Sequence, residues 1–177
     1  MINSITVNLD TVEMMLFYWQ SVSERDKVAD SFMWEVAEKE DMKYLYDDEF
    51  SKDSIRKVLS AISNREMLNN CNKKENRFWN YNMWMLEDME NMNNMVNPIK
   101  RLNLDDLKKE LKDTKTDYDR IEVVFIPGHV EEYYIDENKI VINFFKLLVD
   151  FMDPEKVNIA EKPLKEYIEE KINETLK

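Results

Sequence analysis

The chain has 177 residues, of which 44% are hydrophobic, 11% aromatic and 35% charged, so it carries enough apolar material for one packed domain. This composition excludes an intrinsically disordered chain, a collagen-like fibre and a disulfide scaffold. The formal net charge of -12 repels nucleic-acid phosphates and anionic membrane surfaces, so we do not expect direct binding to nucleic acid.

Several features of the sequence are typical of a cytoplasmic protein. The single cysteine, Cys71, cannot form an intramolecular disulfide, and the first residues lack the basic and apolar regions of a signal peptide. The longest apolar run, residues 14–19, is far shorter than the roughly 20 residues that cross a bilayer. We therefore expect a cytoplasmic location and no membrane partner. One glycine also excludes the glycine-rich phosphate loops of Rossmann and P-loop folds.

The chain begins with two predicted helices. Asp10 is a natural N-cap, and the apolar residues that follow it between positions 12 and 22 have helical spacing. Ser23 and Asp26 form a Ser-x-x-Asp motif that resembles a capping box, which indicates a second helix. The acidic run 47–49 ends this second helix.

The next two predicted helices carry the clearest local signals. A third helix should follow Ser51 or Asp53, because four apolar residues form an amphipathic stripe: Ile55, Val58, Leu59 and Ile62. Asn72 and Glu75 can cap a long fourth helix, which should stop at Pro98. This helix is apolar on more than one face, so we expect it to be central.

After a short fifth helix at 103–112, the pattern changes. Residues 113–119 are polar and look like a linker, and 120–126 read as a β-strand that ends at a Pro-Gly pair. Residues 132–135 and 139–144 flank a short polar loop, so we predict a β-hairpin there.

The last segments predict a short helix at 145–151, a helix start at 153–155 and an amphipathic helix at 163–176. Together, the elements predict a mainly α (α+β) fold with about four to five packed helices, a small two- or three-stranded antiparallel sheet and a C-terminal helix. We divide the chain into a helical body, 1–112, and a hairpin with the terminal helix, 113–177. Both should share one core, because so small a sheet is not stable alone.

Basic, aromatic and asparagine side chains gather between residues 64 and 84. Arginine can hold a carboxylate or phosphate with paired hydrogen bonds, and aromatic rings can stack on a ligand. Some of these side chains are three or four residues apart and share a helix face. We predict that an anionic ligand would be bound by Arg65, Lys74, Arg77, Asn80 and Trp84. The alternative is an ordinary helix start with solvated basic residues and core aromatics.

The only histidine, His129, directly follows the only glycine, Gly128, at a predicted strand end. Glu131 and Glu132 come next, and a histidine beside a glutamate is suited to general acid–base chemistry. We name His129, Glu131 and Glu132 as candidate catalytic residues and expect an unusual backbone conformation at Gly128. The alternative is a loop without a catalytic role. We predict no metal site, because structural zinc needs four ligands, and the sequence identifies no cofactor.

Methionines crowd the predicted fourth helix: Met83, Met85, Met89, Met92 and Met95. Methionine is flexible and polarizable, so it fills gaps in cores and also lines grooves that accept varied partners. Core packing is the first interpretation, and a partly exposed methionine–aromatic groove is the alternative.

The acidity, the high helix content and the lack of a complete catalytic constellation favour a protein-interaction or regulatory module. We expect a protein partner, and a basic one if the negative field steers it, with association slowing as salt rises. The alternative is a small hydrolase or an anionic-ligand-binding enzyme. It would use His129 with nearby carboxylates and the arginine and asparagine side chains of the long helix.

Overall fold

About half of the chain is helical in the computed structural model, which describes residues 1–177. The α-helices are α1 (Asp10–Ser23), α2 (Asp30–Ala37), α3 (Lys52–Ser63), α4 (Lys73–Glu87), α5 (Met89–Lys100), α6 (Asp105–Leu111) and α7 (Leu164–Thr175). Two short 3₁₀ helices are η1 (Glu40–Leu45) and η2 (Phe144–Lys146). None of the helices has both the length and the hydrophobicity that a membrane span requires.

The main sheet has four strands in the order β1-β2-β4-β3. The strands are β1 (Ser4–Asn8), β2 (Arg120–Ile126), β3 (Tyr133–Asp136) and β4 (Lys139–Asn143). β1 and β4 both run parallel to β2, whereas β3 runs antiparallel to β4. A second, antiparallel sheet consists of β5 (Leu148–Val149), β6 (Val157–Ile159) and β7 (Lys162–Pro163).

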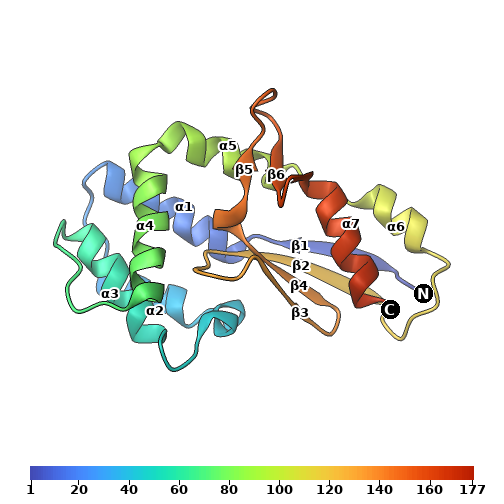
Figure 1. Ribbon diagram of the computed structural model, residues 1–177, viewed down its shortest axis with the longest axis horizontal. Helices are drawn as coiled ribbons and strands as arrows, with labels where there is room; N and C mark the ends of the chain where they lie inside the picture. Colours follow the sequence, from blue (N-terminus) through green and yellow to red (C-terminus); the bar gives the residue numbers. More distant parts are fainter.

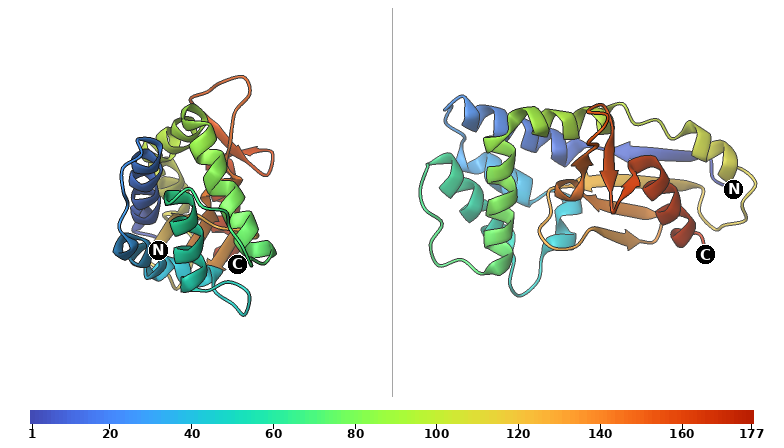
Figure 2. Two further views of the ribbon diagram at one scale, coloured as in Figure 1. Left: turned by 90° about the vertical axis from the view of Figure 1, so that its left-hand side faces the viewer. Right: turned by 45° about the horizontal axis from the view of Figure 1, so that its top comes forward.

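The elements are arranged along one long axis (Figure 1). Helices α1 to α4 gather at one end, the main sheet and α7 lie toward the other, and both termini are at the sheet end. Helix α1 packs on β2, α5 contacts β5 and β6, and α7 contacts β6 and β7. The turn between β5 and β6 projects from the body, which the second view of the ribbon also shows (Figure 2).

One cluster of 42 buried residues forms the core and includes side chains from the helical part and from the sheet. β2 is buried along most of its length, with Val123 to Ile126 all at most 1% exposed, as is typical of a central strand covered on both faces. In the helical part, the Trp19 indole donates to Asn82 Oδ1 at 2.9 Å, and the Tyr18 hydroxyl donates to the Leu59 carbonyl at 2.6 Å.

The elements with strong local signals are confirmed. Ser51 caps α3, and the four residues of its predicted stripe are buried. Asn72 and Glu75 form a reciprocal capping box at the start of α4. The β-hairpin is present as β3 and β4, and the C-terminal helix is present as α7.

The prediction of a small antiparallel sheet is wrong. The main sheet is mixed and gains a strand from the N-terminus, where Ser4 pairs with Arg120 and Asn8 with Val124. Segment 4–8 is too short for an alternation of apolar and polar residues to be recognised in it. Its partner strand also lies far away in the sequence. Residues 145–151, predicted to be helical, instead include the end of η2, the short strand β5 and the start of the turn that follows β5.

The predicted helix count is also too low, because two predicted helices are divided. The long fourth helix breaks at Asp88, which leaves the helical region and accepts a hydrogen bond from the Asn91 N–H, so α5 begins there. Pro98 does not stop this helix, which continues to Lys100. The second predicted helix is shorter, with α2 followed by η1, and Asp26 belongs to the turn that ends α1.

We predict that replacing Asn82 by alanine lowers the free energy of unfolding by about 2–3 kcal/mol, because the Trp19 indole N–H would stay buried without an acceptor. Urea unfolding at neutral pH measures the change. The control is Asn76→Ala, which alters an exposed asparagine of the same helix and should change stability by less than about 0.5 kcal/mol. Equal losses in the two variants would contradict a structural role for the buried amide.

Candidate functional site

The segment that carries the histidine, residues 127–132, is a loop that crosses the end of β4. The loop leaves β2 and must reach the edge strand β3, while β4 lies between these two strands. Asn143, the last residue of β4, is 1% exposed and binds the loop through its side chain. Its Oδ1 accepts from the Gly128 N–H at 3.1 Å, and its Nδ2 donates to the Glu131 carbonyl at 3.0 Å. The Asn143 backbone N–H donates to the Glu132 carbonyl at 2.9 Å.

The prediction of an unusual backbone conformation at Gly128 is wrong, because this glycine has no positive φ. Glycine is required there for space instead. A Cβ added to Gly128 would lie 2.6 Å from both Cγ and Nδ2 of Asn143, far inside van der Waals contact. The loop can approach the amide of Asn143 only because position 128 has no side chain.

His129 lies in the core with 3% of its surface exposed, and both of its ring nitrogens have hydrogen-bond partners. Nε2 is 3.0 Å from the Leu45 carbonyl, and Nδ1 accepts from the Val130 N–H at 2.9 Å. Because Nδ1 faces an N–H donor, these partners assign the neutral tautomer with the proton on Nε2. The ring also packs on Phe50, with the two ring centroids 4.5 Å apart.

The surroundings of His129 keep its ring uncharged. Burial is the main reason that its pKa falls below the ordinary value of 6.5, and the nearby cations Lys74 and Arg77 lower it further. The Leu45 carbonyl and the Asp47 carboxylate act in the opposite direction. The net result is a histidine that joins the loop to η1 as a neutral donor.

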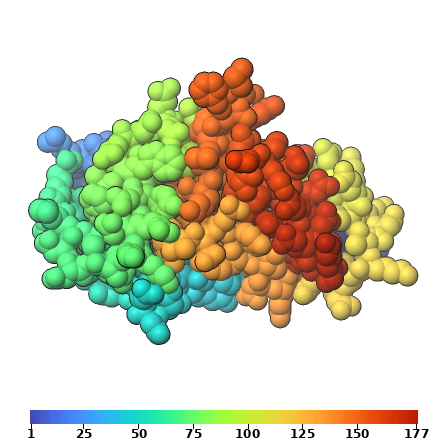
Figure 3. Space-filling view, in the orientation of Figure 1, coloured from blue at the N-terminus to red at the C-terminus, as the bar shows by residue number.

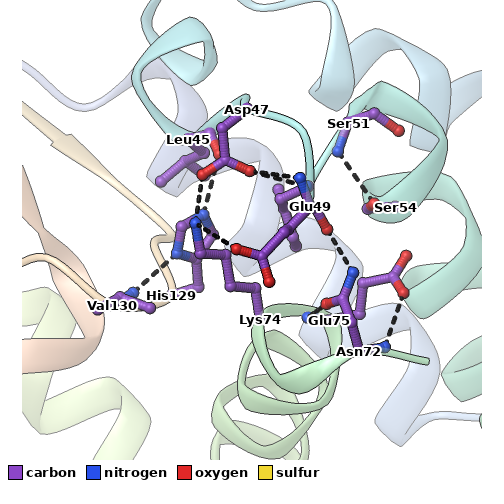
Figure 4. A network of polar contacts seen from close by, with 11 residues as sticks. Leu45, Asp47, Glu49, Ser51, Ser54, Asn72, Lys74, Glu75, His129 and Val130 are labelled. Atoms are coloured by element: carbon purple, nitrogen blue, oxygen red, sulfur yellow. Dashed lines mark hydrogen bonds and ion pairs between the residues drawn. The ribbon is translucent and has the colours of Figure 1, made fainter.

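Beside the histidine, Lys74 of α4 forms ion pairs with two carboxylates of the segment that precedes α3 (Figure 4). Its ammonium pairs closely with Asp47 and lies 3.8 Å from Glu49. Asp47 also accepts from the backbone N–H groups of Glu49 and Phe50, at 2.8 and 2.9 Å. The contact with Lys74 is the main reason that the pKa of Asp47 is lowered, and the two backbone bonds lower it further. The same contact raises the pKa of Lys74.

The capping residues of α4 extend this polar network. Asn72 caps the helix through its side-chain oxygen and donates from Nδ2 to the Glu49 carbonyl. Glu75, which is 8% exposed, accepts from the Asn72 N–H at 3.1 Å and from the Lys57 ammonium at 3.4 Å. The start of α4 is thus fixed to the middle of α3, through Lys57, and to the turn before α3, through Glu49.

Four of the predicted site residues come together at this network. His129 and Lys74 lie side by side, Arg77 is near enough to lower the pKa of His129, and Glu131 is near enough to raise that of Lys74. Glu131 also helps burial to raise the pKa of Tyr134 to about 12.

The other four predicted residues lie elsewhere. Glu132 accepts a 2.7 Å hydrogen bond from the Tyr167 hydroxyl of α7. Trp84 is half-buried against the core, and ten residues of helix separate it from Lys74, which corresponds to about 15 Å along the axis. Asn80 is exposed, and Arg65 follows α3 at the rim of a separate cavity.

The hydrogen bonds of this network are internal to it. General-base catalysis needs a ring nitrogen that can face a substrate, and both nitrogens of His129 are already bonded to the backbone. The Lys74 ammonium is neutralised by its carboxylate partners. No group of three or more His, Cys, Asp or Glu side chains is arranged to hold a metal ion. The arrangement is suited to fixing loop 127–132 against η1 and α4.

The sequence reasoning missed Asn143, which organises the loop. A signal was present, because Asn143 is a polar residue that directly follows three apolar strand residues, Ile140 to Ile142. A second missed residue, Arg25, lines the same cavity as Arg65. A signal was present here too, because the segments 22–26 and 62–66 share one pattern, an apolar residue, serine, a polar residue, arginine and an acidic residue.

We predict that the histidine makes stability depend on pH. The unfolded chain binds a proton near pH 6.5, whereas the folded ring stays neutral to a lower pH, so stability is lost as the pH falls from 6.5 toward the depressed pKa. The slope for this one group is at most about 1.4 kcal/mol per pH unit. Urea unfolding from about pH 7.5 to 5.5 measures the slope, and His129→Gln should reduce it. An unchanged slope in that variant would contradict the neutral buried ring.

Comparisons with known proteins supply no relative. No protein-family model matches the chain, no curated protein matches it in sequence, and no solved structure matches its fold. A function for this chain therefore rests on its own surfaces and cavities.

Proposed function

We propose that this protein is a protein-interaction module and that it binds its partner through the turn between β5 and β6. The observation that carries the proposal is the exposure of two large apolar side chains on this turn, Phe151 at 96% and Met152 at 84%. Leu148, at the start of β5, is also 58% exposed. The turn stands away from the body of the molecule (Figure 3).

The turn has a defined conformation, which Asp150 maintains. Its Oδ1 accepts from the backbone N–H groups of Met152 and Asp153, at 2.8 and 3.2 Å, and its Oδ2 accepts from the Asn158 side chain at 3.0 Å. The Asp150 N–H donates to the Lys156 carbonyl at 2.9 Å. The hydrogen bonds to its carboxylate lower the pKa of Asp150. The two apolar side chains are therefore presented by an ordered turn.

An ordered turn with exposed apolar side chains favours binding for two reasons. Aromatic and other large side chains provide most of the binding energy at interfaces when they enter a partner's pocket. Less conformational entropy is lost on binding when the segment is already ordered. Phe151 and Met152 gain no packing within the chain, so burial against a partner removes their apolar surface from water.

The charge around the turn indicates the chemistry of the partner. Asp150, Asp153 and Glu155 surround the apolar pair, against one cation, Lys156. An apolar pocket edged with basic side chains complements this surface. The net charge of -12 would attract such a partner over a longer range, and salt would weaken that attraction. This agrees with the basic partner expected from composition.

We predict that Phe151→Ser and Met152→Ser each weaken binding to the partner by at least about 30-fold, the loss expected when an interface anchor is removed. Surface plasmon resonance with the purified partner measures the dissociation constants. The matched control is Met67→Ser, because Met67 is 83% exposed but lies in the connection between α3 and α4. Unfolding curves for all three variants should remain close to the wild-type curve.

The partner can be identified with a photo-crosslinking amino acid at position 151 or, as a control, at position 67. We expect discrete crosslinked proteins from position 151 that are absent from position 67. The yield of these crosslinks should fall in high salt. Identical crosslinks from the two positions would contradict the proposal. So would a partner whose affinity is the same for Met152→Ser and Met67→Ser.

A further inference from the structure

A cavity of about 560 Å³ is lined by the ends of α1 and α3 and by one face of α4, and we call it the α4 cavity. Its volume falls within the range of about 300–1,000 Å³ that is usual for small-molecule sites. Its floor is apolar and consists of Val22, Ala61, Ile62, Trp79, Met83 and Leu86. The three α4 residues in this floor are spaced as i, i+4 and i+7 and form one helix face.

Two arginines stand at the rim of the α4 cavity in equivalent positions. Arg25 follows α1 and Arg65 follows α3, each one residue beyond the C-cap. At each position the backbone N–H bonds back to the helix, from Arg25 to Val22 and from Arg65 to Ile62. The next residue also bonds back, so both helices end in a Schellman motif.

The backbone at both arginines is left-handed, with φ of 64° at Arg25 and 57° at Arg65. Glycine is the usual residue at this position of the motif, because a Cβ is disfavoured in the left-handed region. Other left-handed residues of the chain include Glu137 and Ala160, so the conformation alone does not mark a site. At Arg25 and Arg65, however, the residues with this conformation both line the same cavity.

Both guanidinium groups lack a partner within the protein. Neither Arg25 nor Arg65 makes an ion pair or a side-chain hydrogen bond, although the chain has 37 acidic residues. Both remain available to a ligand carboxylate, which arginine can bind with two parallel hydrogen bonds.

One floor residue of the α4 cavity, Trp79, has a buried indole N–H without a partner. Trp79 Nε1 is the one buried side-chain nitrogen or oxygen of the structure without a hydrogen-bond partner. A buried indole N–H normally has an acceptor, as Trp19 has in Asn82. Because Nε1 itself is closed to solvent, a ligand in the cavity would lie on the exposed part of the Trp79 ring, and the indole N–H signal would report its presence through the ring.

From these observations we infer that the α4 cavity binds a small organic acid with an apolar body and one carboxylate. The apolar body would lie on Trp79 and Met83, and the carboxylate would lie at Arg25 and Arg65. Glu66 and Glu87 also line the cavity and would repel a ligand of high negative charge. The site therefore selects a monocarboxylate over a polyphosphate. The inference does not depend on the β5–β6 turn.

The test uses 4-phenylbutyrate as the probe, with the full-length protein and two-dimensional ¹H–¹⁵N NMR. We expect the indole N–H signal of Trp79 to shift saturably, with a dissociation constant on the order of 1 mM or tighter, while that of Trp19 stays fixed. The neutral analogue 4-phenylbutan-1-ol should bind at least about tenfold more weakly, because it lacks the carboxylate. ATP should cause no saturable shift.

Arg25→Gly and Arg65→Gly separate the ligand role from a structural role. Each should weaken binding of 4-phenylbutyrate at least about tenfold, yet raise Tm by about 2–4 °C, because glycine relieves the left-handed backbone. Arg101→Gly changes an exposed arginine at the end of α5, where φ is -96°, and should leave the affinity for the probe unchanged. Equal binding of the acid and the alcohol, unaltered binding in both rim variants, a fixed Trp79 signal or tighter binding of ATP would each overturn the inference.

Discussion

The side-chain amide of Asn143 is the interaction on which the rest of the architecture depends. β2 and β4 can be parallel neighbours only if loop 127–132 crosses the end of β4, and this amide bonds the loop at two points. The same Oδ1 accepts from the Phe145 N–H, which starts η2 and places Phe145 5.0 Å from the ring of Tyr81 on α4. One buried amide therefore joins the sheet, the crossing loop and the helical body, and in such a network each bond constrains the others.

The parts of the fold that the sequence predicts are those with local causes. The capping box at Asn72 and the stripe from Ile55 to Ile62 depend on residues within a few positions of each other, and both were identified correctly. The sequence did not reveal the parallel strand at 4–8 or the division of the long helix at Asp88. Strand 4–8 has its partner more than a hundred positions away, and the break at Asp88 depends on a cap formed after a whole helix of favourable spacing.

In the candidate site too, the sequence did not reveal contacts between side chains that are far apart in the chain. His129 is prominent in the sequence because it is the only histidine and follows the only glycine. Packing explains the glycine and the histidine as well as catalysis would. The glycine makes room for Asn143, and the histidine ring bonds two backbone groups. The basic residues of 64–84 were predicted as one site, but the structure divides them between a polar network at Lys74 and a cavity at Arg65. Sequence spacing does not reveal which neighbours neutralise each charge.

The pairing of β1 with β2 also has a consequence for how the chain folds. Ser4 lies opposite Arg120, so the helices from α1 to α6 form one long loop between the two strands. Contacts of such high sequence separation slow folding, because the loop must close before the strands gain their hydrogen bonds. During synthesis, α1 must wait for β2, the strand on which it packs, until nearly three-quarters of the chain has been made. The contact of α1 with α4 can form earlier, but the part of α1 that packs on β2 stays uncovered until then, and this exposed apolar surface makes the interval before β2 appears sensitive to aggregation.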